Sequence, residues 1–369
     1  MKKENDREGD WQVLDKFRVE IDRIDESIIP LLCRRQEVAA SIGKLKGALG
    51  MDIFNPAREQ EVLRRLSSVK MKGLPPEAVR HIFSEIISAA RAVQGPFNVA
   101  FLGPEATFTH QAATSLFGRS TLFRAADTIE EVFGLVEKGA CRQGVVPIEN
   151  SYEGAVNSTL DLLYKFELKI GAEVFLRIRH HLLSRTEDVK KLSLVYSHPM
   201  AIAQCRSWIR NHLPGISVRE VESTSLAAKM ACEERNAAAI AGRLSGLLYD
   251  LPIVRENIED HPDNVTRFLV IGKTDSEPTG KDKTSILFSL SHTPGALYRV
   301  LKALAEKGIN MTRIESRPMK RRNWEYLFFV DLEGHEQDEN MHEAITEMEG
   351  LCDFVKRLGS YPTGGDPWD

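Results

Sequence analysis

The chain has 369 residues, 42% of them hydrophobic and 28% charged, as is typical of a soluble protein with two or three domains. Its net charge of −4 argues against binding to nucleic acid or to an anionic membrane surface, and no apolar run approaches the roughly 20 residues of a membrane span. The charged N-terminus and the five scattered cysteines predict a cytoplasmic protein without a disulfide or zinc site.

The first predicted element is a long helix over residues 14–45, in which apolar side chains recur every three or four positions. Arg35 interrupts this stripe, and a charge there is costly unless a carboxylate or an anionic ligand pairs with it. Lys46 lies three turns further on nearly the same face, whereas Arg18 lies about 100° away, as a site shared between two subunits would allow. Pro30 lies inside the helix and predicts a kink.

Two more helices are expected before residue 95. The first begins at Asn55, a capping residue followed by proline, and carries Arg58 and Glu59. The second covers residues 77–94 and ends on Gln94, a polar side chain on the core face. Each polar residue alone is as readily a structural ion pair or cap. Together, the charges directed into a helical bundle favour a site for a small anionic ligand.

This pattern over residues 10–95 resembles the all-helical chorismate mutase domain of the AroQ type. The resemblance implies a cofactor-free rearrangement of chorismate to prephenate, catalysed by donors that hold the folded substrate. It implies catalytic roles for Arg18 (from the partner subunit), Arg35, Lys46, Glu59 and Gln94, with Asn55 and Arg58 binding substrate. Asn55 and Ala90 stand where the family often has Asp and Ser, and with Pro30 they bear on the efficiency of this activity.

Beyond Gly95-Pro96, strands and helices alternate to about residue 272, which predicts an α/β domain of two lobes with a parallel or mixed sheet. Polar segments lie at strand ends, where such domains bind ligands, although Ser, Thr and Asn there also serve as helix caps. In one of them, Thr266 and Arg267 stand where a polar loop meets an apolar strand over residues 268–271. A hydroxyl beside a guanidinium can bind an anion, or it can simply begin a solvated strand.

The run VVPIENSYEGAVNST, the YSHP turn and the TRF stretch make residues 97–273 resemble prephenate dehydratase closely, with a periplasmic-binding-protein-like fold of two lobes. The resemblance implies that prephenate, or alternatively arogenate, loses carbon dioxide and water without a cofactor. Thr266 would donate to the departing hydroxyl. The implied substrate-binding residues are Glu149, Asn150, Ser151, Ser197, Gln204, Glu222, Arg267 (unless it is structural) and Phe268. Met200 and Ala106 stand where the family often has Gln and Gly.

After a polar linker, the order strand, helix, strand, strand, helix, strand predicts a ferredoxin-like unit. The expected elements cover residues 285–290, 296–306, 310–315, 324–332, 340–348 and 354–358. Residues 284–361 resemble an ACT domain, which implies that L-phenylalanine binds between paired domains as an inhibitor. The implied contacts are Gly295, Ala296 and Leu297 before the first helix, and Glu315, Ser316, Arg317 and Pro318 after the second strand. The tail after Tyr361 has no predicted role.

The expected domains are therefore residues 1–95, 97–273 and 284–361. As a whole the chain resembles the bifunctional chorismate mutase–prephenate dehydratase family, an isomerase and lyase of phenylalanine biosynthesis expected to form a homodimer or homotetramer. One alternative is a dehydratase whose helical segment serves only dimerisation. The other is a non-enzymatic protein that senses an amino acid, which would have no need of the Thr266 hydroxyl.

Overall fold

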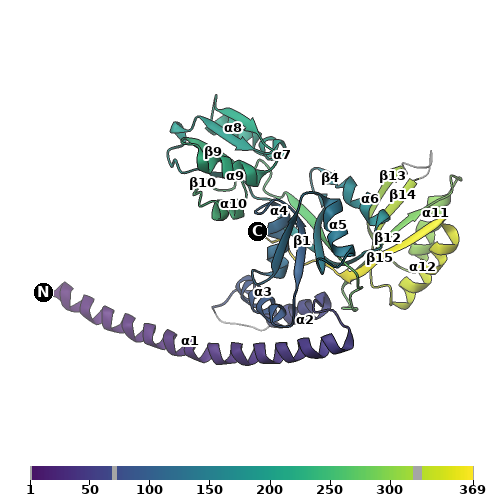
Figure 1. The fold of residues 1–369 in the computed structure, drawn as a ribbon, viewed down its shortest axis with the longest axis horizontal. Helices are drawn as coiled ribbons and strands as arrows, with labels where there is room; N and C mark the ends of the chain where they lie inside the picture. Colours follow the sequence, from purple (N-terminus) through teal and green to yellow (C-terminus); the bar gives the residue numbers. More distant parts are fainter. Residues whose placement is uncertain (1, 69–72, 319–325, 369) are drawn as a thin grey trace.

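The computed structural model describes residues 2–68, 73–318 and 326–368, which form three parts in chain order (Figure 1). A helical module comes first, a two-lobed α/β domain occupies the centre, and an α+β domain lies at the far side of the first lobe. This multi-domain arrangement confirms the predicted fold class. Within the described ranges, no helix is both long enough and apolar enough to cross a membrane.

The helical module consists of α1 (Lys2–Leu49), α2 (Pro56–Ser67) and α3 (Pro76–Ala92). Asn55 caps α2 as predicted, because its side chain accepts a hydrogen bond from the backbone N–H of Arg58. Pro30 lies inside α1 without ending it, and Figure 1 shows one gently curved rod. Gly43 lets α1 approach the end of α3 closely, since a Cβ there would lie 2.5 Å from the Cα of Gln94.

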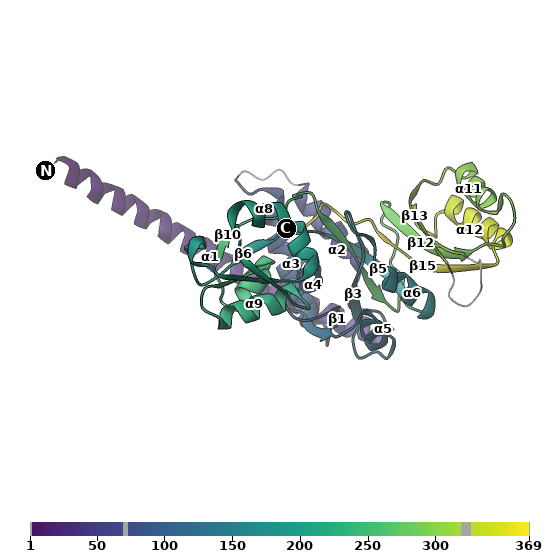
Figure 2. The ribbon, with the colours of Figure 1, turned by 90° about the horizontal axis from the view of Figure 1, so that it is seen from above.

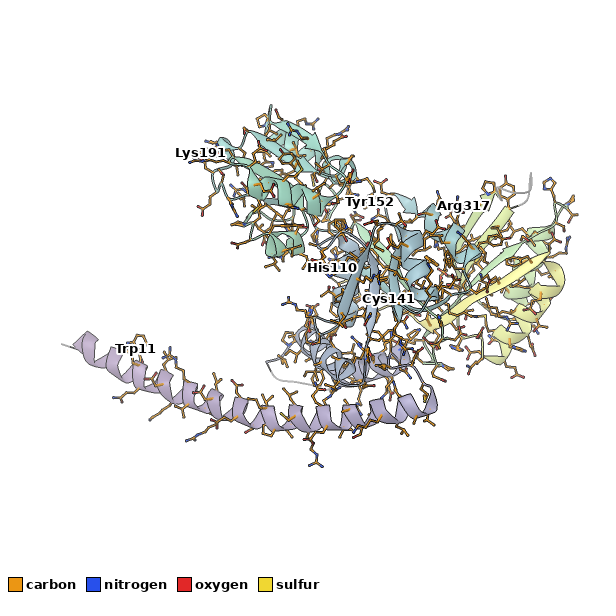
Figure 3. All side chains as sticks on the ribbon, in the orientation of Figure 1. Trp11, His110, Cys141, Tyr152, Lys191 and Arg317 are labelled. Atoms are coloured by element: carbon orange, nitrogen blue, oxygen red, sulfur yellow. The ribbon has the colours of Figure 1, made fainter. Side chains whose placement is uncertain are left out.

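The N-terminal half of α1 extends away from every other element (Figure 2). Figure 3 labels Trp11 on this projecting part, and the apolar stripe predicted from the sequence lies open to solvent along it. Phe17, Ile21 and Ile24 are 59%, 58% and 53% exposed. Because this part of α1 projects from the rest of the chain, its apolar stripe can be buried only by packing against another helix.

The first lobe is built on a mixed sheet in the order β2-β1-β3-β11-β5, with the short β4 paired to β3. Strands β1, β2 and β3 run parallel to one another, whereas β11 runs antiparallel to its neighbours β3 and β5. The sheet is therefore mixed, which was one of the two arrangements predicted. The strands are β1 (Asn98–Leu102), β2 (Leu122–Ala126), β3 (Gln143–Asn150), β4 (Gly154–Ala155), β5 (Lys169–Arg177) and β11 (Val265–Gly272); the helices are α4 (Phe108–Phe117), α5 (Ile129–Glu137) and α6 (Asn157–Lys165).

The second lobe has its own sheet, in the order β10-β6-β9-β7-β8. The chain enters this lobe after β5 and returns through the loop before β11, so two segments connect the lobes. Its strands are β6 (His181–Leu183), β7 (Leu194–Ser197), β8 (Ser217–Glu220), β9 (Ala237–Ala241) and β10 (Ile253–Arg255); its helices are the 3-10 turn η1 (Val189–Lys191), α7 (Pro199–Gln204), α8 (Arg206–His212), α9 (Thr224–Glu233) and α10 (Arg243–Leu248).

The C-terminal domain has the predicted βαββαβ order around a sheet arranged β13-β14-β12-β15. Its elements are β12 (Asp282–Ser289), α11 (Ala296–Glu306), β13 (Met311–Pro318), β14 (Tyr326–Glu333), α12 (Glu339–Leu351) and β15 (Phe354–Pro362). The expected start of the third strand, at residue 324, lies outside the described residues. One face of this sheet packs on α11 and α12 through an apolar core, which includes Phe288 and Val330.

Candidate functional site

A cavity of about 320 Å³ lies among the three N-terminal helices. The predicted residues Arg35, Lys46, Asn55, Arg58, Glu59 and Gln94 all line it. They converge because α1 contributes the first two, α2 begins at the capped Asn55, and Gln94 follows the end of α3. The structure therefore brings six of the seven predicted residues of the helical module to one site.

The two cations from α1 are directed into this cavity without a carboxylate of their own. Arg35 donates from Nη1 to the carbonyl of Ile86 at 3.3 Å, and Lys46 donates from Nζ to the carbonyl of Ile53 at 2.8 Å. Burial lowers the pKa of both side chains, although Glu59 and Asp52 partly offset this for Lys46. Neutral carbonyl partners leave the positive charges available to an anionic ligand.

Arg91 also lines the cavity, although it was not among the residues predicted from the sequence. Arg91 is 2% exposed, and its guanidinium forms an ion pair with Glu59, while its Nη2 donates to the carbonyl of Phe117 in the α/β domain. Its position near the end of α3, three residues before Gln94, was the available signal. Arg91 both orients the Glu59 carboxylate and ties the helical module to α4.

Arg18 is the one predicted residue of this module that lies away from the cavity. It lies in the N-terminal half of α1, where its guanidinium is exposed and pairs with Asp15 at 3.1 Å. In a single chain, therefore, only the inner half of α1 contributes to the cavity. Arg58 lines the cavity but pairs with Glu61 on the surface of α2 at 2.6 Å.

A second cluster of polar side chains surrounds Thr266, on β11 close to the segment that returns from the second lobe. Asn150 donates from Nδ2 to Thr266 Oγ1 at 2.8 Å and to Asn264 Oδ1 at 2.7 Å. Ser151 accepts the backbone N–H of Val265 at 3.0 Å. Asn264 is 2% exposed and was not among the predicted residues, because an Asn in a polar loop is indistinguishable from a turn residue.

Thr266 and Arg267 do not face the same way, contrary to the interpretation that they form one anion site. The strand begins at Val265 rather than at residue 268, and adjacent strand residues point to opposite faces. Arg267 is buried against Glu173 and the C-terminal domain, and Glu149 faces the same side. Phe268 packs inside the apolar core of the first lobe. The contacts of Arg267 are therefore those of a structural residue, the alternative to a substrate-binding one.

The predicted residues of the second lobe are more dispersed. Ser197 is fully buried and donates to the carbonyl of Ile240 at 2.6 Å, so it serves the fold of this lobe rather than the Thr266 cluster. Gln204 accepts at Oε1 from His180 Nε2, at 2.8 Å. Because burial lowers the pKa of His180, its ring is neutral and donates to this amide oxygen. Glu222 is exposed beside α9.

The two lobes also touch at the loop after β1. Ser225 and Ser245 of the second lobe donate from Oγ to the carbonyls of Glu105 and Ala106. Ala106 has a φ of 62°, which explains why glycine is favoured at this position. Its backbone N–H donates to His110 Nδ1 at 3.0 Å.

In the C-terminal domain, Gly295 has a φ of 77° and precedes α11, so the predicted turn before this helix requires a residue without Cβ. Ala296 is buried and Leu297 packs against the same core. Residues 315–318 belong to β13, an edge strand of the sheet. Arg317 points towards the first lobe, where it donates to the carbonyl of Asn157 and pairs with Asp161 at 3.2 Å.

Among the described residues, no group of three His, Cys, Asp or Glu side chains is arranged to hold a metal ion. What the geometry offers instead is one cavity with free cationic donors and one hydroxyl–amide cluster next to a lobe junction. Both arrangements act by hydrogen bonding and charge, which suits reactions of anionic substrates.

Three family models match the chain in order: chorismate mutase type II over residues 17–95, prephenate dehydratase over 99–276 and the ACT domain over 284–350. A bifunctional chorismate mutase/prephenate dehydratase of Aquifex aeolicus is 47% identical over 95% of this chain and 98% of its own length. A protein of the same name from Pseudomonas aeruginosa is 41% identical over 96% and 99%. The prephenate dehydratase of Arthrobacter aurescens, solved in complex with L-Phe, superposes with a TM-score of 0.67 at 32% identity, over 72% of this chain and 89% of that one.

Proposed function

The chain belongs to the family of bifunctional chorismate mutase/prephenate dehydratases, and we propose which of its residues carry out each reaction. It is an enzyme of phenylalanine biosynthesis with two catalytic domains and an ACT domain. The first domain rearranges chorismate to prephenate, and the second converts prephenate to phenylpyruvate, carbon dioxide and water. We divide the chain into residues 1–95, 97–273 and 284–361, which the changes from helical to α/β to α+β structure support.

The mutase reaction takes place in the helical cavity. Arg35 binds a carboxylate of chorismate, while Lys46 and Gln94 donate to the ether oxygen, where negative charge develops in the transition state. Glu59, held by Arg91, accepts the substrate hydroxyl. The cavity supports these roles because, among the described residues, Arg35 and Lys46 donate to neutral carbonyls rather than to carboxylates, and its volume of about 320 Å³ suits one small ligand.

The mutase site is completed by a second copy of the chain. The exposed apolar stripe of α1 pairs with the same stripe of its partner, and Arg18 of the partner subunit then reaches the cavity. The length of the exposed stripe supports such a helix pair. The expected assembly is a homodimer or a pair of such dimers.

The dehydratase reaction depends on the hydroxyl of Thr266. Asn150 donates to Oγ1 of Thr266, so the hydrogen of this hydroxyl remains available for a ligand. This single observation carries the assignment, because a hydroxyl that only accepts among the described residues has its hydrogen free to donate to the substrate. Thr266 donates to the hydroxyl that leaves prephenate, and ring aromatisation with loss of carbon dioxide supplies the driving force.

L-phenylalanine is the inhibitor, bound at Gly295–Leu297 and the edge strand β13 between paired ACT domains. The positive φ of Gly295 supports this, since the turn exposes backbone to a ligand. Inhibition requires that phenylalanine bind the active and inhibited forms with different affinities.

The test is an assay of the purified chain with chorismate and no added cofactor. Chorismate loss and phenylpyruvate formation are followed separately, with and without L-phenylalanine. We expect both reactions to proceed and phenylalanine to suppress the second. Conversion of added prephenate alone would reduce the helical module to a dimerisation element, and phenylalanine binding without turnover would favour an amino-acid sensor.

A further inference from the structure

Two neighbouring cross-strand residue pairs in the first-lobe sheet lie between the Thr266 cluster and the ACT domain. In the antiparallel pairing of β3 with β11, Asn150 lies opposite Thr266 and Glu149 lies opposite Arg267. The first pair is joined by its hydrogen bond at 2.8 Å. The second pair, 4.0 Å apart, points to the other face of the sheet, where the ACT domain lies.

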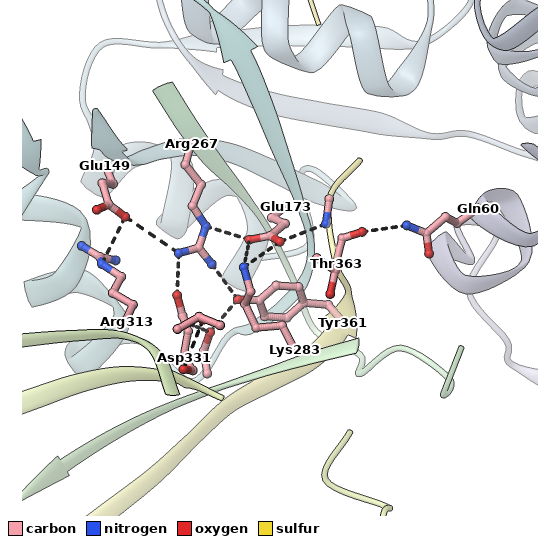
Figure 4. A network of polar contacts seen from close by, with 12 residues as sticks. Gln60, Glu149, Glu173, Arg267, Lys283, Arg313, Asp331, Tyr361 and Thr363 are labelled. Atoms are coloured by element: carbon pink, nitrogen blue, oxygen red, sulfur yellow. Dashed lines mark hydrogen bonds and ion pairs between the residues drawn. The ribbon is translucent and has the colours of Figure 1, made fainter. Parts of the chain in front are cut away.

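Every side of the Arg267 guanidinium is held on that face (Figure 4). Its Nε donates to Glu173 at 2.7 Å, its Nη1 to Asp331 at 2.5 Å, and its Nη2 to the hydroxyl of Tyr361 at 3.0 Å. Glu173 belongs to the dehydratase, whereas Asp331 and Tyr361 belong to the ACT domain. Because a guanidinium is a rigid planar fork, it cannot keep all three bonds if the ACT sheet moves relative to β11.

Further contacts connect the same cluster to neighbouring elements. Lys283 of the ACT domain pairs with Glu173 at 2.9 Å, and Arg313 on β13 pairs with Glu149 at 3.2 Å. Three cations and three carboxylates thus balance one another across the domain boundary. Ser285 donates to Asp331 and contacts the hydroxyl of Tyr361 at 2.6 Å. Arg267, Glu173 and Asp331 are buried, and buried charges require such partners, so the cluster fixes the relative position of the two domains.

Residues 315–318, which are proposed to bind L-phenylalanine, lie on the same strand as one member of this cluster. Arg313 lies on β13 only two residues before Glu315, and β13 pairs with β14, which carries Asp331. A displacement of β13 therefore acts directly on both ACT partners of the β3–β11 pair. From Asp331 on β14, the path to Thr266 passes through the ion pair with Arg267 and one peptide unit.

We propose that Arg267 and Glu149 are positioning residues of the dehydratase: their ion pairs with Asp331 and Arg313 of the ACT domain set the geometry of Thr266 and Asn150. The ACT domain is thus a structural component of the dehydratase site and acts on it through these two pairs. This inference rests on the proposed function, in which Thr266 is the donor and L-phenylalanine the ligand.

The test uses the full chain and the more accessible of the two pairs, so that the variants fold. Glu149→Gln, Arg313→Gln and the double variant are compared with Arg357→Gln, which removes an ion pair with Glu349 inside the ACT domain. We expect the first three to lower kcat for prephenate at least fivefold with little change in KM. We expect the double variant to be no worse than Glu149→Gln alone, because the loss of the Glu149 carboxylate already breaks its pair with Arg313. Mutase activity and the Kd for L-phenylalanine stay within twofold, while maximal inhibition falls.

A second readout does not depend on turnover. Hydrogen exchange at the amides of residues 149–151 and 265–267 should rise in Arg313→Gln and respond less to added L-phenylalanine, with the amides of α3 unchanged. Unchanged exchange there, or unchanged kcat and inhibition in folded variants, would overturn the proposal. If the wild-type chain does not convert prephenate at all, the proposed function fails, and the exchange measurement still decides whether the ACT pairs position β11.

Discussion

The guanidinium of Arg80, on α3, lies 3.7 Å from the centroid of the Trp368 ring. This contact joins the helical module to the C-terminal tail, residues 363–368. The tail also accepts a hydrogen bond from Gln60 at the carbonyl of Thr363, and it extends the first-lobe sheet, where the backbone N–H of Trp368 donates to Phe175 at 2.9 Å. The tail therefore ties together the ACT domain, the edge strand β5 and the mutase helices, a role that the sequence did not suggest.

Replacing the Trp368 ring should loosen the mutase module from the dehydratase. Trp368→Ala removes a buried ring and its cation–π partner, which we expect to weaken the docking of the helices by about 2 kcal/mol. Limited proteolysis of the connection around residue 95 should then accelerate roughly tenfold or more. Trp368→Phe, which keeps an aromatic ring, is the matched control. Equal cleavage rates for wild type and Trp368→Ala would show that the tail does not hold the helices.

The strained backbone at Ala106 predicts a graded response to substitution. At a φ of 62°, Ala106→Gly relieves backbone strain but loses a buried methyl group, so we expect a change in unfolding free energy within about 1 kcal/mol. Ala106→Val places a β-branched side chain in the same conformation and should cost about 2 kcal/mol or more. Denaturant titration of the two variants checks this order. A valine variant as stable as wild type would contradict it.

Shared mutase sites predict complementation between two inactive variants. Arg18→Ala and Arg35→Ala should each lose most chorismate turnover, because each removes a carboxylate clamp from every site. When the two proteins are unfolded together and refolded, half of the dimers are mixed and each mixed dimer has one intact site. We expect about a quarter of wild-type activity to return. If mixing restores nothing, Arg18 acts within its own chain or not at all.

The mutase activity should fall at a lower pH than it would if Lys46 had the ordinary pKa of a lysine. Burial lowers the pKa of Lys46, and only the protonated ammonium neutralises charge on the ether oxygen. Activity is therefore full below this lowered pKa and falls as pH rises through it. Glu59→Gln removes an interaction that raises the pKa, so the alkaline limb should move to lower pH. Lys46→Gln, which cannot titrate, should show a lower but flat profile over that range.

The sequence was sufficient for features whose signals are local. Helical spacing, the Asn55 cap and the βαββαβ order each depend on neighbouring residues, and the structure has all three. The cavity residues were predictable because they recur at helical spacing on helices that are joined by short loops. The relative orientation of Thr266 and Arg267 was not, because it depends on where β11 begins, and polar residues at a strand start obscure that boundary.

The buried ion pairs were beyond sequence reasoning for a different reason. Lys283 and Glu173 are 110 positions apart, and each looks like a solvated charge on its own strand. Only the packing of two sheets shows that these charges face one another. The surroundings of Ser197 were equally hidden, since the sequence does not show that its hydroxyl donates to the buried carbonyl of Ile240.

The central claim is that Thr266 serves only the second of two reactions in one chain. The most direct test is the progress curve of chorismate with Thr266→Val, a substitution that keeps the shape of this nearly buried side chain and removes its hydroxyl. We predict that chorismate disappears at the wild-type rate and prephenate accumulates, with phenylpyruvate formation reduced at least a hundredfold. Phenylpyruvate formation at the wild-type rate would contradict the account.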